Sequence, residues 1–149
     1  QEPAGYVLLR FSARHDESTH KRRVAWLEEL RSGKWTQIAR HLTYFEDGEC
    51  VGACCLGVAS EILHEELAVE RQLNGRMGLY RGKNNSESLL LLKEFRLALG
   101  LMSSSPSVVA KIDGEVTVKE VAELNDEKVP FAVIADLLEG QMNYERSLA

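Results

Sequence analysis

The sequence has little of what marks a membrane-spanning or a disulfide-rich protein. No apolar run approaches the roughly 20 residues that cross a bilayer, and the longest, Leu89–Leu92, ends at a lysine. The first ten residues have neither a basic start nor a long apolar stretch, so we expect no signal peptide. Cysteine is scarce, with three residues that all fall within positions 50–55. An odd cluster of this kind is no disulfide framework and predicts free thiols in a reducing cytoplasm.

Motifs of catalysis are also missing. The chain has no GxSxG, HExxH or phosphate-loop spacing, so we expect no catalytic residues, no cofactor and no metal. Two minor hypotheses stay open. Zinc could bind Cys50, Cys54, Cys55 and His64, although neighbouring residues of a helix point about 100° apart. Cys54 or Cys55 could instead be a nucleophile activated by His41 or His64, although the surrounding carboxylates would raise the thiol pKa.

What is present suits one globular domain. Apolar residues make up 44% of the chain and charged residues 28%, which is the balance of a protein with one packed core. We predict a single domain over 1–149 of the α+β class, mainly helical, with about four main helices and two short β-hairpins. Its less regular parts are predicted to be an N-terminal arm (1–18), a flexible loop (74–86), an internal linker (103–107) and a frayed tail (142–149).

Apolar residues at helical spacing predict the helices. The four main ones are expected at 19–32, 54–72, 89–99 and from Pro130 onward, with short helical turns at 37–42 and 121–124. Asp16 or Ser18 can cap the first helix. Gly57 costs about 1 kcal/mol inside a helix, which predicts a close contact with another helix or a strand.

Two Asp-Gly pairs between β-forming residues predict the hairpins. One is expected to turn at Asp47-Gly48 and end near Ala53, and the other to turn at Asp113-Gly114 between 108–112 and 115–118. A further short strand is expected at 6–11.

Three stretches in combination resemble a known group of proteins. They are WLEELRSGKWTQ at 26–37, CCLGV at 54–58, and AELND at 122–126 leading to Phe131 and to IADL at 134–137. This combination resembles small uncharacterised proteins of tailed bacteriophages and prophages, over roughly 26–60 and 97–139. Ser60 stands where such proteins often carry a third cysteine, and 71–86 departs from their pattern. The resemblance implies a phage origin and carries no site residues with it.

Charge is distributed in blocks that suggest a ligand site. The net charge is −5, yet 1–43 and 71–98 are net basic while 44–70 and 99–149 are net acidic. Guanidinium and ammonium groups can hold phosphate, and an aromatic face can stack on a base. The predicted ligand-binding residues, from the end of the first helix and from the 74–86 loop, are Arg31, Lys34, Trp35, Gln37, Arg40, Tyr44, Arg76, Arg81 and Lys83. In the alternative interpretation, the cations offset a helix dipole and the tryptophans fill the core.

These features predict a non-enzymatic phage accessory protein in the cytoplasm of the infected bacterial host. Its partner would be either a small anionic, nucleotide-like immune signal that it sequesters or a host defence protein that it inhibits. A nucleic-acid-binding protein is the alternative, although a net charge of −5 disfavours sequence-independent binding. A thiol-dependent enzyme is the second alternative, and no membrane partner is expected.

Overall fold

The computed structural model describes residues 16–147, so the predicted strand at 6–11 lies outside the described residues. The described part contains five helices: α2 (Glu17–Arg31), α3 (Cys55–Leu63), α4 (Lys93–Ala98), α5 (Val121–Asp126) and α6 (Phe131–Ser147). It contains seven strands: β1 (Thr43–Glu46), β2 (Glu49–Ala53), β3 (Glu70–Asn74), β4 (Met77–Arg81), β5 (Ser86–Glu87), β6 (Ser107–Ile112) and β7 (Glu115–Glu120). The first five strands form one antiparallel sheet in the order β2-β1-β4-β3, with β5 also paired to β4, and β6 pairs with β7.

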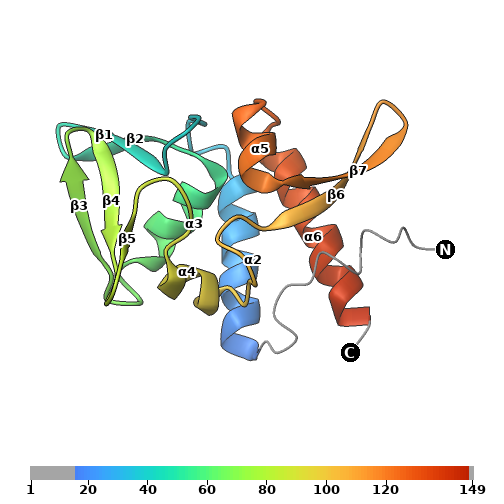
Figure 1. Ribbon diagram of the computed structural model, residues 1–149, viewed down its shortest axis with the longest axis horizontal. Coiled ribbons are helices and arrows are strands. Elements are labelled where there is room, and N and C mark those ends of the chain that lie inside the picture. Colours follow the sequence, from blue (N-terminus) through green and yellow to red (C-terminus); the bar gives the residue numbers. More distant parts are fainter. Residues whose placement is uncertain (1–15, 148–149) are drawn as a thin grey trace.

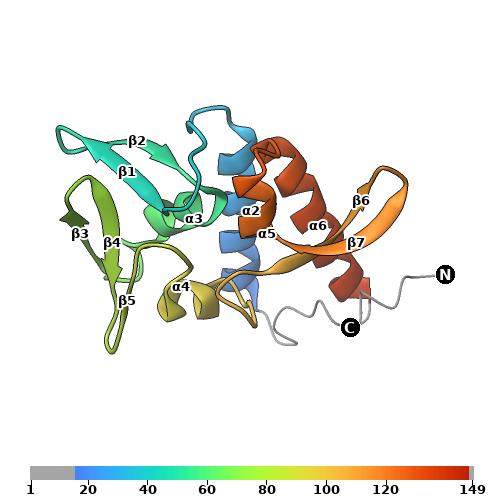
Figure 2. The ribbon, with the colours of Figure 1, turned by 45° about the horizontal axis from the view of Figure 1, so that its top comes forward.

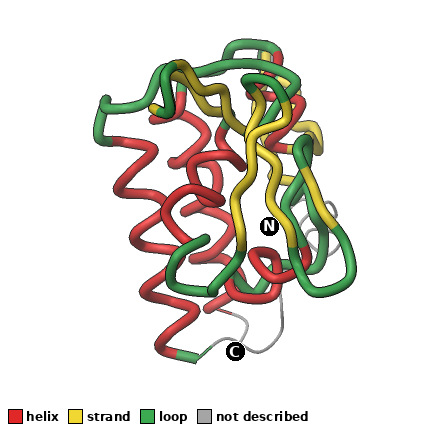
Figure 3. The backbone as a smooth tube through the Cα atoms, turned by 90° about the vertical axis from the view of Figure 1, so that its left-hand side faces the viewer, coloured by secondary structure: helices red, strands yellow, loops and turns green. Residues whose placement is uncertain are grey.

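Helix α2 runs through the middle of the molecule (Figures 1 and 2). The five-stranded sheet and α3 lie on one side of it, and α6 with the β6–β7 hairpin lies on the other. The helices gather on one side of the sheet (Figure 3). The fully buried Trp26 of α2 donates a hydrogen bond from Nε1 to the carbonyl oxygen of Cys55 at 2.9 Å. This bond fixes α2 against the start of α3.

The prediction of a mainly helical fold with two hairpins is wrong. The class is α+β, but strands make up two antiparallel sheets that hold seven strands among the described residues. The main cause is the 74–86 segment, which was expected to be a loop and instead contains β4 and the start of β5. Gly75 has φ +65° and is the first residue of a two-residue turn between the paired Asn74 and Met77, as in a type II′ hairpin.

Other predicted boundaries also change. The helix expected at 54–72 ends at Leu63, because the chain then turns into β3. The expected helical turn at 37–42 is instead extended near Gln37, which bridges to Ala53. The helix expected at 89–99 shortens to α4, and the tail expected to fray from 142 belongs to α6 as far as Ser147. The expected linker at 103–107 is bent and leads into β6.

Several local predictions are confirmed. Helix α2, at Glu17–Arg31, agrees with the predicted 19–32 to within two residues at each end, and the Asp16 carboxylate caps it by accepting a hydrogen bond from the Thr19 backbone nitrogen at 2.9 Å. Both Asp-Gly pairs turn between antiparallel strands. The last helix begins just after Pro130 and buries Phe131 and Ile134.

The buried side chain of Asn125, at the end of α5, joins three segments of the chain. Its Oδ1 accepts hydrogen bonds from the Cys55 backbone nitrogen at 3.1 Å and from Gln37 Nε2 at 3.0 Å. Its Nδ2 donates to the Ile38 carbonyl oxygen at 2.7 Å. The side chain is 1% exposed, so its partners would lose these bonds without full replacement by water.

We therefore expect Asn125→Ala to lower the free energy of unfolding by about 2–4 kcal/mol, because it leaves the Cys55 N–H and the Ile38 carbonyl without partners. Urea denaturation measures this change. Asp126→Ala is the matched control, since Asp126 is exposed and accepts one bond from the Arg40 backbone, and it should cost less than about 1 kcal/mol. Equal costs for the two variants would show that Asn125 is not a structural tie.

Gly57 in α3 meets the backbone of Leu42, just before β1. A Cβ at this position would lie 1.7 Å from the Leu42 carbonyl oxygen, so the close contact exists, but with the chain just before β1 rather than with a helix or a strand. Gly57→Ala should lower the free energy of unfolding by about 1–3 kcal/mol or more, because backbone must move. Gly140→Ala in α6, where nothing lies within 4 Å, should raise it by about 0.5–1 kcal/mol. Thermal unfolding of the two variants tests the contrast, and a neutral Gly57→Ala would contradict the contact.

Candidate functional site

The predicted ligand-binding residues fall into three groups that lie apart. The first is at and after the end of α2, the second lies where β1 meets β4, and the third is at the end of β4. Helix α2 ends at the top of Figure 1, whereas β4 ends at the bottom. Arg81 and Lys83, at and after the end of β4, are therefore not placed over the end of α2, where they are expected from the sequence to cover a ligand.

The cations at the end of α2 are paired with carboxylates of the protein itself. Arg31 Nη2 lies 2.6 Å from Asp136 Oδ1 and 2.9 Å from Glu139 Oε1, both on α6. The hydrogen bond to Asp136 raises the pKa of Arg31 further. Lys34 Nζ lies 3.1 Å from Glu29 Oε1. A ligand anion would have to compete with these carboxylates.

The neighbouring polar groups also bind within the protein. Trp35 Nε1 donates to Glu29 Oε1 at 2.9 Å, and this bond lowers the pKa of Glu29. Gln37 Nε2 donates to Asn125 Oδ1 and to a backbone carbonyl. Arg40 is exposed. Apart from Arg40, the predicted ligand-binding side chains at and after the end of α2 are therefore already bonded to other groups of the protein.

The second group is a pair formed by Tyr44 and Arg76. Arg76 Nη1 lies 3.1 Å from the Tyr44 hydroxyl, and this hydrogen bond raises the pKa of Arg76. Arg76 borders a hollow of about 310 Å³ between the β1–β2 and β3–β4 turns. Glu46 and Asp47 line the same hollow, so its charge does not favour an anion.

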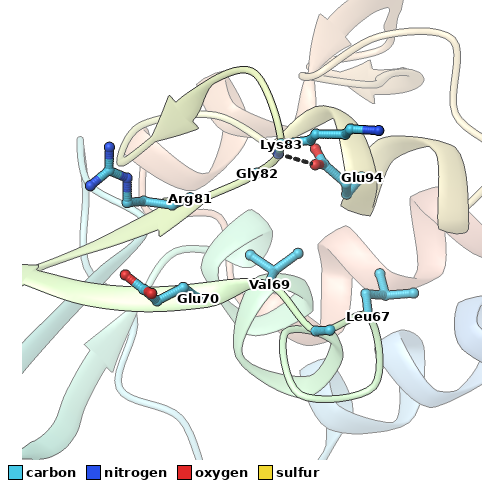
Figure 4. A pocket seen from close by; sticks show the side chains of 8 residues that line it. Leu67, Val69, Glu70, Arg81, Gly82, Lys83 and Glu94 are labelled. Carbon is cyan, nitrogen blue, oxygen red and sulfur yellow. Dashed lines mark hydrogen bonds between the residues drawn. The ribbon is translucent and has the colours of Figure 1, made fainter.

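The third group, Arg81 and Lys83, lies in a cleft of about 500 Å³ that we call the β4 cleft (Figure 4). Its walls are the turn after α3, the chain after β4 and the first turn of α4. The lining residues are Leu67, Ala68, Val69, Glu70, Arg81, Gly82, Lys83 and Glu94.

The β4 cleft has a charged group of each sign at both ends and an apolar middle. Arg81 and Glu70 project at one end, Lys83 and Glu94 at the other, and Val69 lies between them (Figure 4). The Lys83 backbone nitrogen donates to Glu94 Oε2 at 2.7 Å. Within residues 16–147, Arg81 makes one long hydrogen bond, to Gln72 Oε1 at 3.5 Å, and neither cleft cation forms an ion pair. Both cations are therefore available to a ligand.

The other residues of this cleft are not among those predicted from the sequence. Glu70 and Val69 were expected inside a long helix, and no Gly or Pro between 58 and 74 marks where that helix stops. The left-handed backbone at Ala68, with φ +55°, makes the turn without such a residue. The sequence does contain a signal for the hairpin that follows. Gly75-Arg76 separates two five-residue stretches, and Gly at the first central position of a two-residue turn is typical of a type II′ hairpin.

The cysteines lie in surroundings that suppress thiolate formation. Cys54 and Cys55 are buried and Cys50 is half-buried, and all three are free thiols. Burial raises the pKa of Cys54 to about 11 and that of Cys55 well above its usual value, and it also raises the pKa of Cys50. A thiolate nucleophile needs the opposite shift.

Tyr80 is the other buried group that could take part in proton transfer. Its hydroxyl lies 2.6 Å from Glu61 Oε2 and 2.8 Å from Thr43 Oγ1, and burial raises its pKa above the usual value. Glu61 in turn lies 3.5 Å from Arg71 Nε. Because Tyr80 is fully buried, this network joins the sheet to α3 and offers no proton to a bound substrate.

Residues 16–147 include no grouping of three or more His, Cys, Asp or Glu side chains that could hold a metal ion. In the same range, every helix is too short or too polar to cross a bilayer.

One family model, described as a domain of unknown function (DUF8296), matches residues 19–142. No curated protein and no solved structure matches the chain.

The burial of the thiols predicts their reactivity. At pH 8 the raised pKa values keep Cys54 and Cys55 protonated, so iodoacetamide should label Cys50 first and the buried pair at least about tenfold more slowly. Mass spectrometry of timed samples measures the three rates, and labelling in urea supplies the control, because unfolding should make them similar. Fast labelling of Cys54 or Cys55 in the native protein would contradict the buried environment and favour a reactive thiol.

Proposed function

The chain belongs to the DUF8296 family, whose function is unknown, and from its geometry we propose a non-enzymatic protein that binds a small nucleotide-like anion in the β4 cleft. One observation supports this proposal above the others. Arg81 and Lys83 share a cleft and form no ion pair within residues 16–147. Arg31 and Lys34, by contrast, are held by carboxylates.

The size and chemistry of the β4 cleft favour a nucleotide over a simple anion. Its volume of about 500 Å³ lies in the usual range of small-molecule sites. A guanidinium and an ammonium can hold phosphate oxygens, while carboxylates such as Glu70 and Glu94 can accept hydrogen bonds from ribose hydroxyls, as acidic residues do in dinucleotide sites. Leu67, which is half-buried, and the exposed Ala68 offer apolar surface to a base. Inorganic phosphate would gain nothing from the carboxylates and would be repelled by them.

The alternatives have less support. A nucleic acid needs a row of cations along its phosphates, whereas the cations of this sheet are separated by Glu70 and Glu46. A thiol enzyme needs an accessible thiolate, and Cys54 and Cys55 are buried with raised pKa values.

The resemblance to bacteriophage proteins suggests where such binding would act. We propose the cytoplasm of an infected bacterium, where sequestering a nucleotide-like signal would weaken a host response. Inhibition of a host defence protein is the related proposal, and it becomes the leading one if the β4 cleft binds no nucleotide.

Isothermal calorimetry with mono-, di- and cyclic nucleotides tests the site. Each charge-assisted contact contributes about 1.5–3 kcal/mol, so Arg81→Ala and Lys83→Ala should each weaken binding about 10- to 150-fold. Inorganic phosphate should bind more weakly than the best nucleotide, because it leaves the carboxylates and the apolar middle unused.

Two matched controls separate the β4 cleft from the other predicted groups. Arg31→Ala and Arg76→Ala remove a guanidinium of the same kind outside the cleft and should leave the affinity unchanged. If a nucleotide binds and Arg81→Ala does not weaken it, the ligand lies elsewhere. If no nucleotide binds at all, the proposed function is wrong.

A further inference from the structure

The two outer strands of the five-stranded sheet differ in how their free edges are covered. The chain at 36–38 runs along β2, where the Ile38 backbone nitrogen donates to the Ala53 carbonyl at 3.0 Å and the Ala53 nitrogen donates to the Thr36 carbonyl at 2.9 Å. Among the described residues, no strand pairs with the outer side of β3. One edge of the sheet is therefore closed and the other is open.

The open edge of β3 presents backbone groups in a fixed pattern. Asn74 and Met77 flank the two-residue turn and form its hydrogen-bonded pair, as in type II′ hairpins. Hydrogen-bonded pairs alternate along an antiparallel ladder, so Gln72 and Glu70 also bond to β4. The N–H and C=O groups of Arg71 and Leu73 then point away from β4. These two residues offer a donor and an acceptor each to another strand.

Strand β3 has only part of the usual protection of an edge. Two of its five residues, Glu70 and Arg71, are charged, and Arg71 is paired with Glu61 of α3. The strand contains no proline or lysine, its pairing with β4 runs without a bulge, and Leu73 is 49% exposed. Edge strands that stay single are commonly blocked by such devices.

The sequence of β3 is complementary to itself in one orientation. In an antiparallel pair centred on Gln72, Arg71 faces the partner's Leu73 and Glu70 faces the partner's Asn74, so no like charges meet. A parallel pair would place glutamate against glutamate and arginine against arginine, which is unfavourable. An antiparallel pair centred on Arg71 would oppose two guanidinium groups. In the register centred on Gln72 all five residues of β3 are paired, and the outward N–H and C=O groups of Arg71 and Leu73 all form hydrogen bonds.

We propose that β3 pairs with β3 of a second copy of this chain, antiparallel about Gln72, and forms a two-fold dimer with one continuous sheet. The two Arg71–Leu73 pairs each exchange both backbone hydrogen bonds. This interface is short, so association depends on protein concentration and is weak compared with an obligate dimer.

Sedimentation velocity of the full chain over about 10 µM to 1 mM tests for this dimer. Leu73→Pro removes an outward N–H without removing a bond to β4, and it should weaken dimerisation at least about tenfold. A lysine substitution gives a matched comparison between the two outer strands, with Leu73→Lys in β3 and Val51→Lys in β2. Both replace an exposed apolar residue of an outer strand, and only Leu73→Lys should weaken the dimer.

A change at Asn74 tests the register itself. Asn74→Lys places an ammonium opposite the partner's Glu70 and should tighten the dimer about 2- to 30-fold, whereas Asn74→Glu should weaken it by a similar factor. A chain that stays monomeric over the whole concentration range overturns the proposal, and so does a dimer that Leu73→Lys leaves intact. If Leu73→Lys weakens the dimer but neither Asn74→Lys nor Asn74→Glu changes its affinity, the proposed register is wrong. None of these outcomes depends on nucleotide binding.

Discussion

The Asn125 amide is the contact on which most of the arrangement depends. Three segments far apart in the sequence meet at this one side chain: the extended chain at 37–38, the start of α3 at Cys55, and the end of α5. An amide is suited to this role because it accepts twice through one atom and donates through the other. A carboxylate could not donate to the Ile38 carbonyl, and an apolar residue could do neither.

Two consequences follow from this tie. Because Ile38 is held by Asn125, the 36–38 chain stays beside β2 and closes that edge of the sheet. Because the Cys55 backbone is held at the same point, α3 starts at a fixed place beneath the sheet, and Gly57 can approach the Leu42 backbone closely. The closed edge, the position of α3 and the packing of β1 therefore share one cause. Asn125 forms none of these hydrogen bonds with β3, which lies on the far side of β4 from β1 and β2.

Local signals made part of the fold predictable from the sequence. The Asp16 cap, the helical spacing of α2 and the two Asp-Gly turns act over a few residues, so the sequence near them is sufficient. The sheet was underestimated because β3 and β4 pair through a turn at Gly75-Arg76, and the glycines of this segment, at 75, 78 and 82, are typical of a loop. Gly78 in β4 is required instead by packing, since a Cβ there would lie 2.1 Å from Thr43 Oγ1. That contact joins residues 35 positions apart, which no local pattern reveals.

The candidate site was predictable in its chemistry and not in its location. Arg81 and Lys83 were among the predicted ligand residues, but charge blocks cannot show which cations the fold pairs with its own acids. Arg31 meets Asp136 and Glu139 only because α2 packs against α6. Glu70 and Glu94, which give the β4 cleft its mixed charge, enter it through the turn at Ala68 and through α4, and neither element was predicted with correct bounds.

Glu70 connects the two proposals of ligand binding and dimerisation, because it lines the β4 cleft and is also the first residue of β3. In the antiparallel dimer the same carboxylate would face the partner's Asn74. If pairing turns this carboxylate toward the interface, the cleft loses an acceptor for the ribose hydroxyls and holds a nucleotide less tightly. Linkage then requires that the nucleotide weaken pairing by the same factor. If Glu70 keeps its place in the cleft, the two equilibria are independent, and the open edge and the cleft are separate surfaces of one sheet.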